Sequence, residues 1–216
     1  MRPNSEKTRK MDAKDCILEG ARALFRKNGL KSVTMDELAR SLGMSKRTIY
    51  ENFKDKNALI EACLLKSAAD ATARRNKILD SNSNVYEVMY QFAQLQHQEF
   101  SGINPVLFDD LRKYYSDLLA KSKSKNQNNS LKLLERLFKT GIDGQFFNGD
   151  NFNVEVASRL ICNSIEFAID LIDNHKFAPY EVYRTIFYPF FRGISTEKGI
   201  GELDKVNLKM CGHKKQ

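Results

Sequence analysis

The chain has 216 residues, which is enough for one or two domains with a sizeable core. Its formal charge is +8, and no apolar run approaches the roughly 20 residues of a membrane-spanning helix, so we expect no membrane partner. Residues 1–66 hold 15 Lys/Arg against 9 Asp/Glu, whereas residues 67–216 hold 20 against 18, a distribution typical of a basic DNA-binding module joined to a second domain.

The N-terminal residues 1–12 are charged and lack the apolar segment of a signal peptide, so we expect a flexible basic arm. A basic arm of this kind can also reach into a DNA minor groove, although a solvated tail is the favoured interpretation.

The four cysteines, Cys16, Cys63, Cys162 and Cys211, are scattered without metal-ligand spacing. Together with the missing export signal, this predicts free thiols, a cytoplasmic location and no metal site or cofactor.

Residues 13–58 are predicted to form a helix-turn-helix DNA-binding domain. A first helix ends at Asn28-Gly29, and its apolar residues follow the spacing of one buried face. Thr34 is a good N-cap for a second helix, with Glu37 completing a capping box. Gly43 ends that helix, because glycine adopts the left-handed conformation without steric cost. Ser45 then caps a third helix. The expected core residues are Ile17, Ala21, Leu24, Phe25, Leu38, Leu42, Ile49 and Phe53.

The third helix carries the side chains that are expected to bind DNA. Lys46, Arg47 and Thr48 fill its first turn, which points at base edges when such a helix enters the major groove. Arginine and lysine can donate to guanine O6 and N7, and threonine can contact thymine. Side chains able to bond phosphate oxygens follow, namely Tyr50, Asn52, Lys54 and Lys56. An ordinary helical hairpin with a solvated basic face is the alternative interpretation.

From about Asp15 to Leu64 the chain resembles the TetR family of transcriptional regulators. The resemblance rests on Ala23-Leu24-Phe25, the helix from Thr34 to Leu42, Gly43-Met44-Ser45, Thr48-Ile49-Tyr50, Asn52-Phe53-Lys54, Lys56 and Leu59. It implies a homodimer that binds a palindromic double-stranded DNA operator, usually as a repressor released by a small-molecule effector. By motif position Lys46, Arg47 and Thr48 correspond to base contacts. Thr34, Tyr50, Asn52 and Lys56 correspond to phosphate contacts, and Ser45 and Lys54 complete the set of candidate phosphate-contacting residues.

The remainder is predicted to be helical, giving an all-α fold of about nine helices. Residues 59–193 are expected to form an effector-binding and dimerisation domain, and residues 194–216 a polar C-terminal tail or short extra helix. Proline, glycine and asparagine clusters divide the second domain. The predicted helices cover 56–79, 84–100, 105–121, 130–147 and 154–173, and a last one begins at 179. Residues 122–129 are polar and expected to be mobile, and Pro189 should kink or end the last helix.

The helices at 154–173 and 180–192 are interpreted as the subunit interface, because the first carries an apolar stripe broken by small residues. In related regulators these two helices pair with their copies in a four-helix bundle. The alternative is that they belong to the core of one monomer. The candidate interface residues of the first helix are Ala157, Leu160, Ile161, Ser164, Ile165, Ala168 and Ile172. Those of the second helix are Tyr183, Ile186, Phe187 and Phe190, which form an apolar stripe together with Val182.

An effector pocket for an apolar or aromatic molecule is a hypothesis that follows from the expected architecture. Pockets are mostly apolar with a few placed polar groups, and the middle helices have that character. Each of these residues is individually more typical of a core. The candidates are Tyr90, Gln94, His97, Phe100, Phe108, Tyr114, Phe138, Phe146 and Phe167.

The sequence argues against an enzyme, because it offers no nucleophile–base pair, no paired carboxylates in an apolar setting and no metal-ligand spacing. A ligand-independent architectural or scaffold protein that binds DNA stays open. So does a transcriptional activator, since activators and repressors share this motif.

Overall fold

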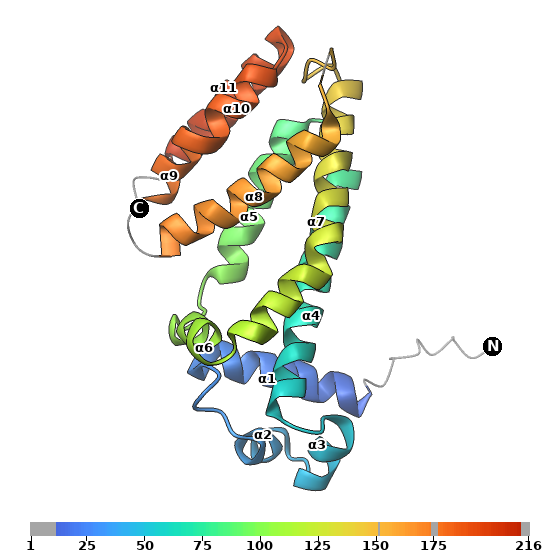
Figure 1. Ribbon diagram of the computed structural model, residues 1–216, viewed down its shortest axis with the longest axis vertical. Helices are drawn as coiled ribbons and strands as arrows, with labels where there is room; N and C mark the ends of the chain where they lie inside the picture. The colour runs from blue at the N-terminus through green and yellow to red at the C-terminus, as the bar shows by residue number, and fades with distance from the viewer. Residues whose placement is uncertain (1–11, 151, 174–176, 213–216) are drawn as a thin grey trace, which may run out of the picture. The chain divides into compact units, whose positions relative to one another are not determined.

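The computed structural model describes residues 12–150, 152–173 and 177–212, with the side chains of residues 173, 211 and 212 left out. Within these ranges the chain is helical and has no strand, and its one isolated β-bridge joins Phe147 to Ser195 (Figure 1). The predicted all-α fold is confirmed. The expected N-terminal arm lies outside the described residues except for Asp12.

The helices of the N-terminal half follow the capping residues closely. The predicted long helix at 56–79 is α4, and the helix at 84–100 is α5, whose N–H groups bond the Asn84 side chain. The bounds are α1 (Ala13–Asn28), α2 (Met35–Leu42), α3 (Lys46–Asn52), α4 (Lys56–Asp80), α5 (Val85–Phe100) and α6 (Val106–Tyr114). In the second half they are α7 (Ser116–Asp143), α8 (Val154–Asp173), α9 (Pro179–Val182), a π-helical turn η1 (Tyr183–Phe187), α10 (Tyr188–Ile194) and α11 (Glu197–Gly212).

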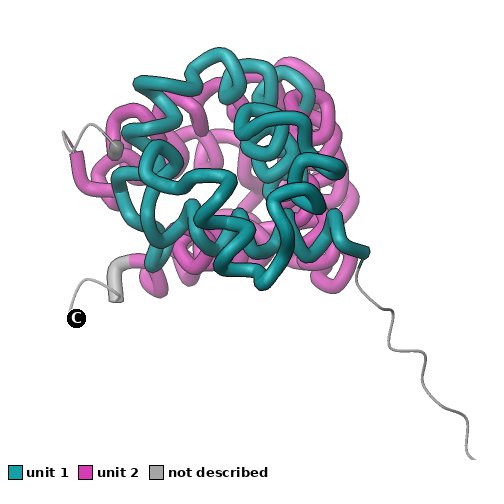
Figure 2. The backbone as a smooth tube through the Cα atoms, turned by 90° about the horizontal axis from the view of Figure 1, so that it is seen from below, with its two compact units in different colours: residues 1–68, 101–125 teal, residues 69–100, 126–216 magenta. Residues whose placement is uncertain are grey.

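The chain forms two compact units, each built from two separate segments (Figure 2). Unit 1 comprises residues 1–68 and 101–125, and unit 2 comprises residues 69–100 and 126–216. The helix-turn-helix unit therefore extends past residue 58 and includes a second segment, 101–125, that the sequence analysis assigned to the other domain. This segment joins unit 1 because Leu111 is buried in its core.

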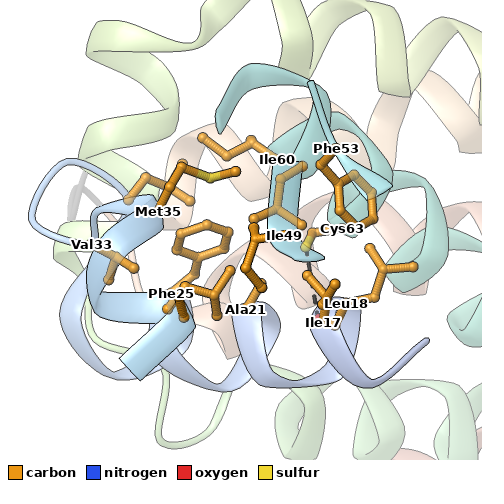
Figure 3. Close-up of a cluster of buried hydrophobic side chains, with 14 of the residues drawn as sticks. Ile17, Leu18, Ala21, Phe25, Val33, Met35, Ile49, Phe53, Ile60 and Cys63 are labelled. Carbon is orange, nitrogen blue, oxygen red and sulfur yellow. Dashed lines mark hydrogen bonds between the residues drawn. The ribbon is translucent and has the colours of Figure 1, made fainter. Parts of the chain in front are cut away.

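The core of unit 1 lies between α1 and the helices that follow it (Figure 3). Ile17, Ala21 and Phe25 form the buried face of α1, as their helical spacing predicts. Ile49 is the buried anchor of α3, with no exposed surface, and so fixes how that short helix rotates about its axis. Of the expected core residues, Leu24 and Leu42 are only partly buried.

Unit 2 has an aromatic core centred on Phe138, which is fully buried. Its ring lies 5.9 Å from that of Phe147 and 5.5 Å from that of Phe152, measured between centroids. The side chains of Leu203 and Val206 enter this core from α11. Of the two alternatives predicted for residues 194–216, a loose polar tail or an extra helix, the described part forms a helix, α11, which buries its apolar side.

Helix α7 contradicts two predicted boundaries. The helix expected at 105–121 breaks at Tyr115, and α7 then runs unbroken through 122–129, so the predicted mobile loop is wrong. Its polar residues stay helical because Lys121 and Lys125 pair with Glu61 of α4, at 3.0 and 2.9 Å, and Ser122 is buried. At its other end α7 stops at Asp143, four residues before the predicted limit.

Pro189 does not end the last helix; it is the second residue of α10, which follows the π-helical turn η1. In a regular α-helix a proline has no N–H to donate to the carbonyl four residues earlier, and its ring collides with that carbonyl oxygen. The π-helical turn η1 lies directly before α10, and the N–H of Tyr188 bonds the carbonyl of Tyr183, five residues back. The wider turn carries the helix past Pro189 into α10.

Candidate DNA-binding surface

Two capped helices hold the candidate surface in place. The Thr34 hydroxyl accepts the N–H of Glu37 at 3.1 Å, and the Ser45 hydroxyl accepts the N–H of Thr48 at 3.1 Å. Between them Gly43 has a φ of 62°, and its N–H bonds the carbonyl of Arg40 at 3.2 Å. This left-handed glycine closes the turn between α2 and α3, so the predicted caps and turn are confirmed.

The first turn of α3 presents its polar side chains outward. Because Ile49 is buried, the side chains on the opposite face must point to solvent. The Arg47 side chain is 87% exposed and that of Lys46 is 63% exposed. Thr48 is half-buried, and its hydroxyl lies 2.9 Å from that of Ser45. The three candidate base-contacting residues therefore form one continuous surface with both cations accessible.

Each of these two cations has a carboxylate partner. Lys46 pairs with Asp36 of α2, and the Arg47 Nε lies 2.8 Å from a carboxylate oxygen of Glu51, one turn further along α3. All four side chains are largely exposed. The sequence analysis did not anticipate these partners, although the four-residue spacing of Arg47 and Glu51 was a usable signal.

The candidate phosphate contacts surround this helix. Tyr50 is half exposed, and the Lys54 side chain is 83% exposed. Asn52 donates to the Thr48 carbonyl at 2.8 Å, which holds its amide at the end of α3. The Asp55 carboxylate accepts the N–H of Ala58 at 2.7 Å and so caps the start of α4. Thr34 and Ser45 are exposed at the starts of α2 and α3.

Lys56 differs from the candidate cations Lys46, Arg47 and Lys54 because it is half-buried. Its ammonium donates to the carbonyl of Lys31 at 3.3 Å. Burial lowers the pKa of this lysine, and the negative charges of Asp110 and Glu37 oppose that effect. The ammonium is thus held at the first turn of α4 by groups that favour its charged form.

The nine candidate pocket residues are divided between the two units. Phe108 and Tyr114 belong to unit 1, and the other seven belong to unit 2. Phe138 and Phe146 are buried in the aromatic core, whereas Phe167 is 57% exposed on α8. Of the remainder, Tyr90 is half-buried and Gln94, His97 and Phe100 are exposed on α5.

Two open hollows of about 650 Å³ each lie elsewhere, one in each unit, and neither is lined by these nine residues. The hollow in unit 1 is lined by α1 and the connection to α6, namely Ala23, Arg26, Lys27, Gly102, Ile103 and Asn104. The hollow in unit 2 lies beside the start of α11 and includes Gln145, Asp150 and Thr196.

The candidate interface residues on α8 fall on two faces. Ala157, Ile161 and Ala168 are buried within their own unit, whereas Leu160 and Ile165 are 50% and 37% exposed. The structure adds three exposed apolar side chains that were not assigned to the interface, namely Val156, Phe167 and Ile169. Ser164, Ile172, Tyr183, Ile186, Phe187 and Phe190 are half-buried.

The described residues offer little chemistry beyond this surface. They contain no group of three or more His, Cys, Asp or Glu side chains placed to hold a metal ion. Cys16, Cys63 and Cys162 are free thiols, and burial raises the pKa of Cys63 to about 12. Over the same ranges, no helix is long and apolar enough to span a membrane.

Two capped helices around a glycine turn, with a polar first turn on the second one, define a helix-turn-helix DNA-binding domain. Comparison with known proteins gives the family. Residues 17–63 match the family described as bacterial regulatory proteins, tetR family. This likeness to the TetR family covers the N-terminal segment, which is less than half of the chain.

Curated relatives agree with this assignment. The transcriptional regulator UidR of Escherichia coli is 32% identical over 84 residues, which cover 39% of this chain and 43% of UidR. The uncharacterized regulator YvaF of Bacillus subtilis is 33% identical over 102 residues, covering 47% and 53% of the two chains. The matched region thus spans about half the length of these relatives. Both relatives are named as transcriptional regulators.

Solved structures show that the likeness in fold extends over most of the chain. A TetR-family regulator from Cytophaga hutchinsonii has a TM-score of 0.65 at 18% identity, covering 88% of this chain and all of the other. SmeT, the repressor of a Stenotrophomonas maltophilia multidrug efflux pump, has a TM-score of 0.63 at 12% identity, with coverages of 89% and 94%.

Proposed function

We propose that the protein is a sequence-specific DNA-binding transcriptional regulator that reads an operator through α3. The observation that carries this proposal is the first turn of α3, where Lys46, Arg47 and Thr48 share one accessible surface. Caps at both helices and the buried anchor Ile49 hold that surface in one orientation. A preorganised donor array suits base-edge recognition, since little side-chain or backbone freedom is lost on binding.

We further propose that two copies bind a palindromic operator. Val156, Leu160 and Phe167 expose apolar surface along α8 at spacings of four and seven residues, so they form one stripe. Apolar stripes of this kind are typical of subunit interfaces. A symmetric dimer presents two copies of α3 to half-sites one DNA turn apart, about 34–36 Å.

Repression that a small molecule relieves is the finer part of the proposal. SmeT is described as a repressor, and another similar structure is described as a gamma-butyrolactone receptor. A ligand that prefers a conformation with a different spacing of the two α3 helices would weaken operator binding by its differential affinity. Activation, or ligand-independent binding as an architectural protein, would use the same DNA surface.

The test is a selection of genomic DNA fragments on the purified protein, followed by footprinting and titration against random duplex. A palindromic footprint that resists random competitor supports the proposal. The logarithm of affinity should fall with the logarithm of salt concentration at a slope of roughly −4 to −8. Failure to retain any fragment above random DNA would count against a specific regulator. Loss of the footprint with a pool of cell metabolites would support an effector.

The variant Arg47→Ala distinguishes sequence-specific base recognition from non-specific electrostatic binding to DNA. It should weaken operator binding by about 1–3 kcal/mol and relax selectivity at one base pair in each half-site. The control is Arg112→Ala, which removes an exposed guanidinium from α6 of the same unit, where it pairs with Asp109 at 2.9 Å. Equal losses on operator and random duplex for Arg47→Ala would contradict a base-reading role.

A further inference from the structure

Lys31, in the connection between α1 and α2, is held through both of its backbone polar groups. Its N–H donates to a carboxylate oxygen of Asp110 at 2.7 Å, and its carbonyl accepts from the Lys56 ammonium at 3.3 Å. Asp110 comes from α6, whereas Lys56 begins α4. Three segments that are far apart in the sequence therefore meet at Lys31, all within unit 1.

Asp110 is an unusual anchor because it is a carboxylate with only 5% of its surface exposed. A buried carboxylate is costly unless hydrogen bonds or opposite charges compensate it. Here the Lys31 N–H supplies the bond, and the Lys56 ammonium is close enough for the charge of Asp110 to oppose the lowering of the lysine's pKa. Gly29 leaves room for the carboxylate, since a Cβ at Gly29 would lie 2.9 Å from the same oxygen.

The helix that carries Asp110 is itself fixed to α1. The N–H of Asn104 donates to the carbonyl of Arg26 at 2.8 Å, and its side-chain amide donates to that of Lys27 at 3.0 Å. These bonds satisfy carbonyls at the C-terminal end of α1. Leu111, next to Asp110, is buried in the core of unit 1. Asp110 is thus presented from a rigid element and not from a loose loop.

Lys56 keeps donors available while it is held. An ammonium group has three N–H donors, and the bond to the Lys31 carbonyl uses one of them. The other two can meet a phosphate oxygen next to the free N–H groups in the first turn of α4. A lysine already held at that point loses less side-chain entropy when DNA arrives than a freely rotating one.

We propose that Asp110 is a positioning residue for DNA binding, which holds the Lys31 backbone and, through it, keeps Lys56 in place to contact a DNA phosphate. The inference rests on the proposed function, because it assumes that Lys56 faces DNA. It assigns to α6 a direct part in shaping the DNA-contacting surface. Because a phosphate contact carries no sequence information, Asp110 should affect operator and random DNA alike.

A double-mutant cycle tests this, with a fluorescein-labelled random-sequence duplex of about 30 base pairs at low salt as the probe. Asp110→Ala and Lys56→Ala should each weaken binding about 10-fold, the size expected when a charged hydrogen-bond partner is lost. If Asp110 acts through Lys56, the double variant should bind like Lys56→Ala alone. A loss near 100-fold in the double variant would show independent effects and overturn the inference, as would unchanged binding by Asp110→Ala.

Two further variants separate positioning from general damage. Asp109→Ala removes a neighbouring carboxylate that is exposed and pairs with Arg112, so its DNA affinity should stay within about two-fold of the parent. Asp110→Asn keeps an oxygen that can accept the Lys31 N–H but loses the charge, so it should weaken binding about three-fold. If Asp110→Ala does not fold, the cycle with Asp110→Asn decides by the same criterion. Failure of the parent protein to bind the duplex would instead count against the proposed function.

Discussion

At the scale of single residues, both candidate base-reading cations already have an acidic partner. Asp36 accepts from Lys46, and Glu51 accepts from Arg47. Exposed ion pairs of this kind contribute only about 0–1 kcal/mol, so DNA can displace the carboxylate at little cost in free energy. The carboxylates nevertheless repel phosphates. A matching base edge offers two acceptors to the guanidinium, whereas a non-matching site offers little to offset that repulsion.

We therefore expect Asp36→Asn and Glu51→Gln to increase affinity for random duplex, by roughly three-fold each at low salt. Operator affinity should rise less, so that the ratio of specific to non-specific binding falls. The measurement is a competition titration with labelled operator and unlabelled random DNA. Glu19→Gln is the matched control, because it breaks an exposed pair with Arg22 on α1 in the same unit. An equal gain in that control would indicate a general charge effect.

Sequence reasoning anticipated the local chemistry of this surface better than its contacts. Thr34, Ser45 and Gly43 act where capping rules put them, because caps depend on neighbours within four residues. The contact between Asp110 and Lys31 joins residues that are 79 positions apart, and no local pattern announces it. Its one trace in the sequence is an acidic pair, Asp109-Asp110, on an otherwise amphipathic helix.

At the scale of elements, α1 and α2 both end at a glycine, but the two glycines differ in their surroundings. Gly43 has a φ of 62°, and a Cβ there would meet no atom within 4 Å. Gly29 has a φ of 82° with a ψ of 175°, a combination suited to glycine alone, and a Cβ there would lie 2.8 Å from Val106. The end of α1 is thus constrained by both backbone and packing.

Gly29→Ala should accordingly destabilise the protein by at least about 2 kcal/mol, because strain adds to overpacking. Gly43→Ala should cost about 1 kcal/mol, from the left-handed backbone alone. Urea unfolding at a fixed protein concentration measures both values. Equal losses in the free energy of unfolding would mean that Val106 moves aside without strain and that α6 does not hold the end of α1.

Elements were harder to predict where tertiary contacts override composition. Residues 122–129 are rich in serine and asparagine, which favour turns over helix interiors. They are helical because ion pairs to Glu61 and apolar contacts on both sides hold them: Leu119 is partly buried against the core of unit 1, and Leu133 is buried in that of unit 2. The position of Pro189 pointed to a distortion, but a π-helical turn and a kink give the same signal in the sequence.

At the scale of the whole molecule, α8 has two apolar sides with different tasks. One side, with Ala157 and Ile161, completes the core of unit 2, and Ala168 on the same side is buried as well. The other side, with Val156, Leu160 and Phe167, is exposed in the single chain. Hydropathy alone could not separate them, and for that reason the sequence analysis mixed buried and exposed residues in one interface set.

Leu160→Asp should convert a dimer to monomers without unfolding the chain, because half of the Leu160 surface is already exposed. A charge placed in an apolar interface should weaken association by roughly 100-fold or more. Sedimentation equilibrium checks the mass, and circular dichroism checks the helix content. Arg159→Ala, on the neighbouring polar side where Arg159 pairs with Glu155, should remain dimeric. If Leu160→Asp stays dimeric, the subunits associate through another surface.

Unit 1 is discontinuous in the sequence, which has a consequence for synthesis on the ribosome. Leu111 and Asp110 complete its core and its α1–α2 connection, yet they follow residue 68 by more than forty positions. At 5–20 residues per second, translation from residue 68 to residue 125 takes roughly 3 to 11 s. During that interval the nascent helix-turn-helix lacks the α6 side of its core. A contiguous N-terminal cassette grafted onto another protein would lack it permanently.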